Sequence, residues 1–185
     1  PPRSTLFPYT TLFRSAYLEW SGGRSPTQLA DALEAVVPPC GCSTWRNRVA
    51  AGLGYTTADK LSLTFEFQHN GAGLDGDGWS ALRQGPVALY GQYRQAVRVS
   101  QELPTRRALF AQALWQDALM PRLDLGLMHN LDLVDRSRRL WAEARYHVDS
   151  MEYALQWVLH EGEAGSVYGA VPEARGWQVL ARYYF

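Results

Sequence analysis

Alternation of apolar and polar residues is the dominant pattern along most of the chain. In the segment 60–67, KLSLTFEF, leucine and phenylalanine take every second position, and serine, threonine and glutamate lie between them. Successive side chains of a β-strand point to opposite faces, so this pattern predicts a strand with one apolar and one polar face. The same alternation predicts further strands at 44–57, 107–116, 121–133, 140–148, 151–160 and 176–185, and a stub at 16–22.

The predicted strands are long, and the connections between them follow a regular order. A strand of about ten residues can cross a hydrocarbon layer at a tilt near 45°, whereas strands of globular proteins more often stop at about five or six residues. Short connections are predicted at the rim that holds Phe185: 57–60, 117–121 and 149–150. Apart from 134–137, the connections at the opposite rim are long: 23–43, 70–105 and 161–175. This arrangement is typical of membrane β-barrels.

Two of the long connections contain predicted helical segments. The segment 25–37, SPTQLADALEAVV, begins with Ser-Pro and is followed by Pro38 and Pro39, which end a helix. The connection 70–105 opens with NGAGLDGDG. These letters faintly resemble a calcium loop but lack its regular aspartate spacing and terminal glutamate, so we expect a flexible loop.

The later part of the connection 70–105 predicts a helix with two arginines on one side. Arg94 and Arg98 are four positions apart, as are residues that share a helix face. Two interpretations stay open. The helix either folds into a pore, where Arg94 and Arg98 line a constriction, or lies as an amphipathic helix on the outer rim.

Charge and aromatic content narrow the classes of partner. The chain has 18 Lys and Arg against 18 Asp and Glu, which argues against a nucleic-acid-binding surface. No run of about 18 apolar residues exists, which excludes a membrane-spanning helix but not membrane-spanning strands. Trp45 with Tyr55, and Trp177 with Tyr183, stand at the two ends of apolar stripes, as expected for aromatic girdles about 25 Å apart. We therefore expect the apolar face to contact lipid.

The polar face of the predicted strands then surrounds water. Its charges are nearly balanced, which predicts a lumen without a strong preference for anions or cations. The predicted lumen-lining residues are Arg46, Arg48, Glu66, Arg122, Asp124, Asp132, Glu143, Arg145, Glu152 and Arg182. In the alternative interpretation, a soluble sheet, the same residues form a solvated exterior and the apolar face turns inward.

The carboxyl terminus carries the most specific local pattern. The final strand alternates Trp177, Val179, Ala181, Tyr183 and Phe185 on one face, and it resembles the terminal strand of bacterial outer-membrane β-barrel proteins. In that family the assembly machinery reads this strand. The resemblance therefore implies an assembly motif at Trp177, Tyr183 and Phe185, with outer-membrane lipid and the barrel assembly machinery as partners and the bacterial outer membrane as location.

Other segments are similar to an uncharacterised porin-like group, namely EWSGGR at 19–24, RNRVAAGLGYTT at 46–57 and FEFQHNGAGLD at 65–75. Residues 1–15, PPRSTLFPYTTLFRS, resemble the translation of a widely used sequencing adapter joined in frame to a gene. The alternative is a Pro- and Thr-rich extension. We expect 1–15 to be a non-native segment, so the predicted fold begins at residue 16. We expect 16–185 to be the C-terminal portion of a larger antiparallel transmembrane β-barrel of about twelve or more strands, eight of them present here.

No residue pattern predicts catalysis or metal binding. Cys40 and Cys42 lie close together in a loop, as an oxidised pair or two free thiols, and the four histidines are scattered over different strands. No nucleophile-elbow motif is present. We expect no enzyme activity and no cofactor. The predicted function is a porin-like channel that passes small hydrophilic solutes, and a homo-oligomer is compatible with it. The alternatives are a structural or adhesive barrel that displays its loops, and a soluble all-β binding protein.

Overall fold

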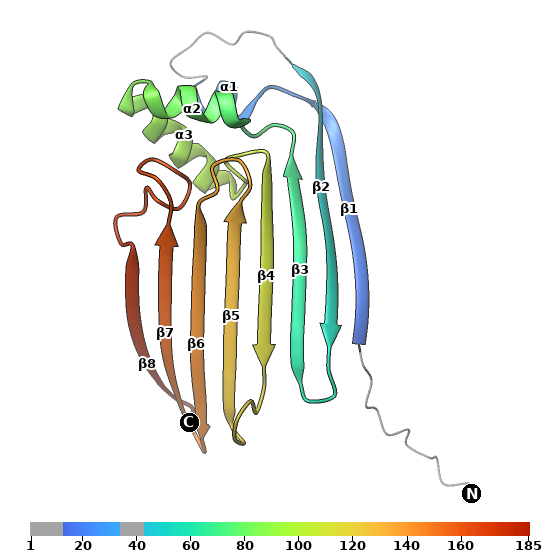
Figure 1. The fold of residues 1–185 in the computed structure, drawn as a ribbon, viewed down its shortest axis with the longest axis vertical. Helices are drawn as coiled ribbons and strands as arrows, with labels where there is room; N and C mark the ends of the chain where they lie inside the picture. Colours follow the sequence, from blue (N-terminus) through green and yellow to red (C-terminus); the bar gives the residue numbers. More distant parts are fainter. Residues whose placement is uncertain (1–12, 34–42) are drawn as a thin grey trace, which may run out of the picture.

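The computed structural model describes residues 13–33 and 43–185, and these residues form one antiparallel sheet of eight strands with three helices (Figure 1). The strands are β1 (Phe13–Ser25), β2 (Thr44–Thr56), β3 (Leu61–Asn70), β4 (Arg107–Trp115), β5 (Leu123–Asp132), β6 (Arg138–Val148), β7 (Met151–Glu161) and β8 (Arg175–Tyr183). The helices are α1 (Gln28–Ala32), α2 (Gly76–Gln84) and α3 (Val87–Ser100). The predicted all-β fold with antiparallel strands is confirmed.

The sheet is open. Strand order follows the chain from β1 to β8, and among the described residues no pairing joins β1 to β8, which lie at opposite edges (Figure 1). Closure needs the two edge strands to meet with a tilt and stagger that suit the number of strands. The eight strands, predicted to be part of a larger transmembrane barrel, therefore do not close into a barrel in this structure, and their position in a membrane stays a prediction.

The connections have the predicted order of lengths. We call the end of the sheet with the short turns 57–60, 116–122 and 149–150 the Phe185 end, and the other the helical end (Figure 1). The helical end carries the connections 26–43, 71–106 and 162–174, with the short turn 133–137. At the Phe185 end, Lys60 donates a hydrogen bond to Asp117 at 2.5 Å. This contact raises the pKa of Lys60 and lowers the pKa of Asp117.

Strand β1 is longer than the stub predicted at 16–22. It continues through Gly22 and Gly23, which pair with Asn47 and Arg46, up to Ser25. At its other end it begins at Phe13, so it includes the last three of the fifteen residues that resemble an adapter. Residues 1–12 lie outside the described part of the chain.

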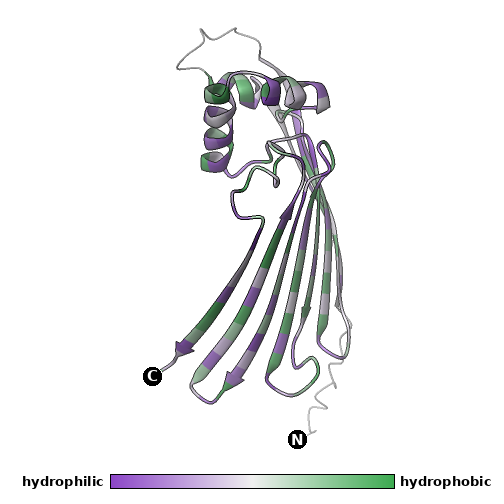
Figure 2. Ribbon diagram, turned by 60° about the vertical axis from the view of Figure 1, so that its left-hand side comes forward, coloured by the Kyte–Doolittle hydropathy of each residue, from purple (hydrophilic) through white to green (hydrophobic). Residues whose placement is uncertain are grey.

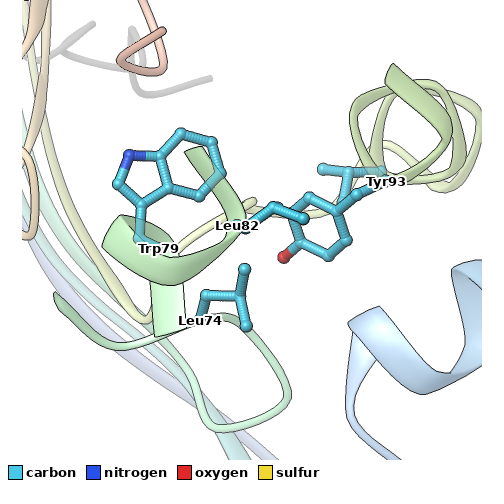
Figure 3. Packing of buried hydrophobic residues seen from close by; sticks show 5 residues of the cluster. Leu74, Trp79, Leu82 and Tyr93 are labelled. Atoms are coloured by element: carbon cyan, nitrogen blue, oxygen red, sulfur yellow. The ribbon is translucent and has the colours of Figure 1, made fainter. Parts of the chain in front are cut away.

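The long connections of the helical end fold into a small cap with its own apolar core. Leu74, Trp79, Leu82, Tyr93 and Val97 are buried together, and Figure 3 shows four of these side chains converging between α2 and α3. The ring centroids of Trp79 and Tyr93 are 6.3 Å apart in an edge-on arrangement. Burial raises the pKa of the Tyr93 phenol, which donates hydrogen bonds to Gln28 and Pro104. None of the helices in the described ranges is long and apolar enough to cross a bilayer.

The N-cap residues of α1 and α2 correct two predictions made from the sequence. The segment 70–78 is not a flexible loop, because the Asp75 side chain accepts a hydrogen bond from the Gly78 amide and caps the start of α2. The helix predicted at 25–37 begins later, at Gln28, with Thr27 as its N-cap. Residues 34–42, which include the rest of that prediction, lie outside the described residues.

Substitution of Trp79 by alanine should loosen the cap and leave the sheet in place. Trp79 is 2% exposed, and loss of a buried tryptophan costs about 3 kcal/mol or more. Hydrogen exchange of the α2 and α3 amides should accelerate roughly 100-fold, whereas exchange in β5 and β6 stays unchanged. Trp79→Phe is the matched control: it keeps a ring and removes an indole N–H that has no acceptor among the described residues. Unchanged exchange in the alanine variant would contradict this account of the cap.

Candidate functional site: the polar face of the sheet

The sheet carries different chemistry on its two faces. Cross-strand pairing places apolar residues opposite apolar residues, as where Phe65 lies between Leu53 and Ala111. Figure 2 shows the resulting alternation of hydrophobic and hydrophilic positions along each strand. Even on interior strands, Leu63, Phe65, Leu127 and Leu155 are 41–48% exposed. Nothing within the described ranges covers the apolar face.

On the polar face, charged side chains of four strands meet near the Phe185 end. Glu152 on β7 is 5% exposed and is the centre of this group. Its carboxylate accepts hydrogen bonds from Arg182 at 3.0 Å and from the Tyr184 hydroxyl at 3.3 Å. Arg145 lies 3.9 Å away, and its guanidinium pairs with Glu143 at 2.7 Å. Glu143 in turn accepts a hydrogen bond from Gln156.

His147 joins this group to β5. A two-residue turn at 149–150, as the sequence predicts, places His147 opposite Glu152, and the strand register confirms this pair. The shorter contact of His147 is with Asp124, at 3.1 Å, whereas its distance to Glu152 is 3.8 Å. Three carboxylates, Asp124, Glu143 and Glu152, therefore face two arginines and one histidine, so most charge in this group is compensated within it. We call these residues, with Arg145, His147 and Arg182, the Glu152 network.

A second polar contact crosses β1, β2 and β3. The Tyr17 hydroxyl on β1 donates a hydrogen bond to Glu66 on β3, which also accepts one from Gln68. The Tyr17 ring passes over Gly52 on the strand between them, where a Cβ atom would lie 2.3 Å from the ring. Glycine at position 52 therefore lets the tyrosine side chain reach Glu66.

At the helical end, three of the predicted lumen-lining residues form ion pairs or hydrogen bonds with the cap and the adjoining connections. Arg48 pairs with Glu102 at 2.8 Å, just after α3. Arg46 donates to the backbone carbonyls of Ser25 at 3.2 Å and Gly71 at 2.9 Å. Asp132 is 2% exposed and accepts hydrogen bonds from Thr105 and from the Val134 and Asp135 amides. These side chains thus connect the polar face to the cap.

Three other predicted site residues lie outside the polar face. Arg122 is in the turn before β5, where it pairs with Asp149 at 3.6 Å. Arg94 on α3 donates hydrogen bonds to the carbonyls of Ser166 and Val167 at 3.0 and 3.1 Å, so it ties the helix to the connection 162–174. Arg98 is an exposed residue of the same helix. Whether this cap narrows a pore stays a prediction.

The predicted carboxyl-terminal motif lies on the apolar face. Trp177 lies beside Trp157 with the rings tilted and 6.2 Å between their centroids, and Tyr183 is the last residue of β8. Phe185 follows the strand and is fully exposed, with its ring centroid 6.3 Å from that of Tyr183. Recognition of these residues by assembly machinery stays a prediction.

Sequence reasoning missed several polar partners. The alternation places Tyr184 and Gln156 on the polar face, but their contacts with carboxylates, and that of Tyr17, appear only in the structure. Glu102 contacts Arg48 from just after α3. Among these contacts, only the one between Tyr17 and Glu66 has a signal in the sequence, namely Gly52. A glycine within a strand often marks a place where another group approaches the backbone closely.

The described residues contain no group of histidine, cysteine, aspartate and glutamate side chains that could hold a metal ion. On the polar face His147 contacts carboxylates, and His160 hydrogen bonds to the Glu173 carbonyl at 2.9 Å, so neither forms a nucleophile-base pair within the described ranges. Cys40 and Cys42 lie outside the described residues. No family model, curated protein or solved structure matches the chain.

Substitution Glu152→Gln should destabilise the sheet by about 2 kcal/mol, because it removes the carboxylate that Arg182 and Tyr184 contact. Denaturant unfolding in detergent, followed by tryptophan fluorescence, measures the effect. Glu173→Gln is the matched control, since it removes the same charge from an exposed residue. Equal midpoints for the two variants would show that the Glu152 network does not stabilise the fold.

Proposed function

We propose that the sheet forms part of the wall of a transmembrane β-barrel in the bacterial outer membrane, where it passes small hydrophilic solutes in the manner of a porin. The observation that carries this proposal is the uncovered apolar face. Full burial of a leucine or phenylalanine side chain stabilises a protein by about 1.5–3 kcal/mol, and here these residues remain exposed on strand after strand. Acyl chains would supply the missing apolar contact.

The helices argue against the soluble alternative. In a soluble all-β protein with one sheet, helices or a second sheet would cover the apolar face. Here the apolar side chains of α2 and α3 pack against one another in the cap, as with Trp79 and Tyr93, and so they leave the sheet uncovered.

The polar face suits contact with water. Charges buried toward lipid would be costly, whereas the Glu152 network and the Tyr17–Glu66 pair keep theirs on the opposite side from the apolar residues. Because Arg145 and Arg182 compensate most of the negative charge of the network, the lumen is expected to accept neutral solutes and ions of both signs.

The interior width that a water-filled channel needs favours a barrel with more strands than the eight described. A closed barrel of about eight strands has an interior that side chains fill, whereas wider barrels leave an aqueous channel. The polar face includes bulky residues such as Phe110, Trp141 and Arg139. Unpaired backbone groups at the open edges of β1 and β8 would also be costly in lipid, so further pairing is needed at both edges.

The display alternative has one observation in its favour. The cap has its own core, and Arg94 and Tyr90 of α3 are tied to the connection 162–174 by hydrogen bonds to Ser166 and Gly165. Such a rigid cap could present a surface outside the membrane. In that case the barrel would conduct no solute.

Lipid contact is tested with variants that keep one of the seven tryptophans and replace the others by phenylalanine. Trp177 is 70% exposed on the apolar face, and Trp141 lies on the polar face opposite Met128. In vesicles of phosphatidylcholine with brominated chains, Trp177 fluorescence should be quenched and Trp141 fluorescence nearly unaffected. Aqueous acrylamide should show the reverse preference. If brominated lipid quenches neither residue, the barrel proposal fails.

Solute passage is tested by the swelling of proteoliposomes in an isosmotic solution of a neutral pentose. The proposal predicts swelling well above that of protein-free vesicles, with similar rates for small anions and cations. Lipid contact at Trp177 without any swelling would instead support the display role.

A further inference from the structure

Four of the strands, β1, β4, β6 and β8, carry an arginine on the apolar face at the helical end of the sheet. Arg107, Arg138 and Arg175 are the first residues of β4, β6 and β8, and Arg24 is the next-to-last residue of β1. The starts of β4 and β6 and the end of β1 all lie beside the cap in Figure 1. We call these four residues the basic rim.

Strand register places the basic rim on the apolar face and not on the polar one. Residues directly opposite each other on neighbouring strands share a face of the sheet, and each of the four arginines is opposite a residue of the apolar face. The cross-strand pairs are Arg24 with Trp45, Arg107 with His69, Arg138 with Leu131 and Arg175 with Leu159. Between this rim and the Phe185 end, the apolar face consists almost wholly of aliphatic and aromatic side chains.

Most of the positive charge of the basic rim is uncompensated. All four residues are exposed. Arg138 pairs with Glu161, its neighbour on β7. No carboxylate in the described part of the chain forms an ion pair with Arg24, Arg107 or Arg175. This contrasts with the polar face, where the arginines of the Glu152 network contact carboxylates.

The opposite rim of the apolar face is aromatic. Its cation Arg14 lies over the Tyr55 ring, 5.4 Å from the centroid, within the segment that resembles an adapter. In the nearby turns Lys60 pairs with Asp117 at 2.5 Å, and the charges of Arg122 and Asp149 also compensate each other. The aromatic residues of this rim are Tyr55, Trp115, Tyr146, Tyr153 and Tyr183.

We propose that the basic rim binds the phosphate groups of anionic lipid headgroups in the leaflet that surrounds the helical end. The inference rests on the proposed function, because it places the apolar face in lipid. Arginine side chains at the edge of a hydrocarbon layer extend their charged heads to the interface, and the planar guanidinium matches phosphate oxygens with two parallel hydrogen bonds. The surface is apolar up to the arginines and polar beyond them. It therefore fits a lipid, whose acyl chains contact the apolar part while its headgroup contacts the arginines, better than a free anion.

The native tryptophans offer reporters for both rims. Trp45 lies opposite Arg24, and Trp115 ends β4 at the aromatic rim. We would compare quenching of each residue, in single-tryptophan chains, by phosphatidylglycerol and by phosphatidylcholine with the same brominated chains, each diluted in ordinary phosphatidylcholine. Because both leaflets have one composition, the orientation of the protein in the vesicle does not affect the comparison.

The expected result is stronger quenching of Trp45 by phosphatidylglycerol, with a preference of about fivefold for each arginine that contacts the headgroup. Trp115 should show equal quenching by the two lipids. The triple variant Arg24→Gln, Arg107→Gln and Arg175→Gln should bring the Trp45 ratio to one. The control triple variant Lys60→Gln, Arg98→Gln and Arg122→Gln, which removes the same charge elsewhere, should keep the preference.

Equal lipid preference at Trp45 and Trp115 in the unmodified background overturns the inference, even if a variant fails to fold. Inorganic phosphate at millimolar concentration should lower the preference no more than chloride of equal ionic strength. If phosphate abolishes the preference specifically, the rim is a site for the free anion and the lipid proposal is wrong. Absence of quenching by either lipid at both residues would instead disprove the membrane location itself.

Discussion

A single sheet has two faces, and alternation along its strands makes one of them almost wholly apolar between its basic rim and the Phe185 end. This is the constraint on which the other features depend. Because the cap uses its own apolar residues for its own core, no part of the described chain remains to cover Leu63, Phe65 or Leu127. An exposed apolar face is favourable only against other apolar groups, and a charged face only against water, so the proposed barrel wall would meet both conditions.

The strands could be predicted from the sequence because a period of two is a local signal that needs no knowledge of distant contacts. The register followed as well: a two-residue turn at 149–150 fixes His147 opposite Glu152. The prediction failed where a local signal opposes the tertiary pairing. Gly23 suggests the end of the strand predicted at 16–22, yet it pairs with Arg46 of β2, since pairing with the neighbouring strand overrides the weak strand preference of glycine.

The cap and the site depended on information that the sequence does not show locally. Asp75 looks like part of a glycine-rich loop until the helix that it caps is in place. The direction of Arg94 is decided by carbonyls more than seventy positions away in the chain, and Glu102 meets Arg48 only because α3 returns to β2. Helical spacing placed Arg94 and Arg98 on one side of a helix, but it could not tell which surface that side would meet.

The charges of the polar face are compensated by neighbouring side chains, whereas most charges of the basic rim are not, and exposure to water accounts for the difference. Glu152 and Glu143 have side chains that are 6% and 9% exposed, and a charge with so little access to water must find a partner within the protein. Arg107 and Arg175 begin their strands at positions where the side chain still reaches water, so they need no carboxylate partner. Unpaired cations at a boundary therefore remain available to a ligand, whereas the balanced charges of the polar face are already committed to one another. The same distinction supports both proposals: unselective passage along the charge-compensated polar face, and lipid binding by the unpaired arginines of the basic rim.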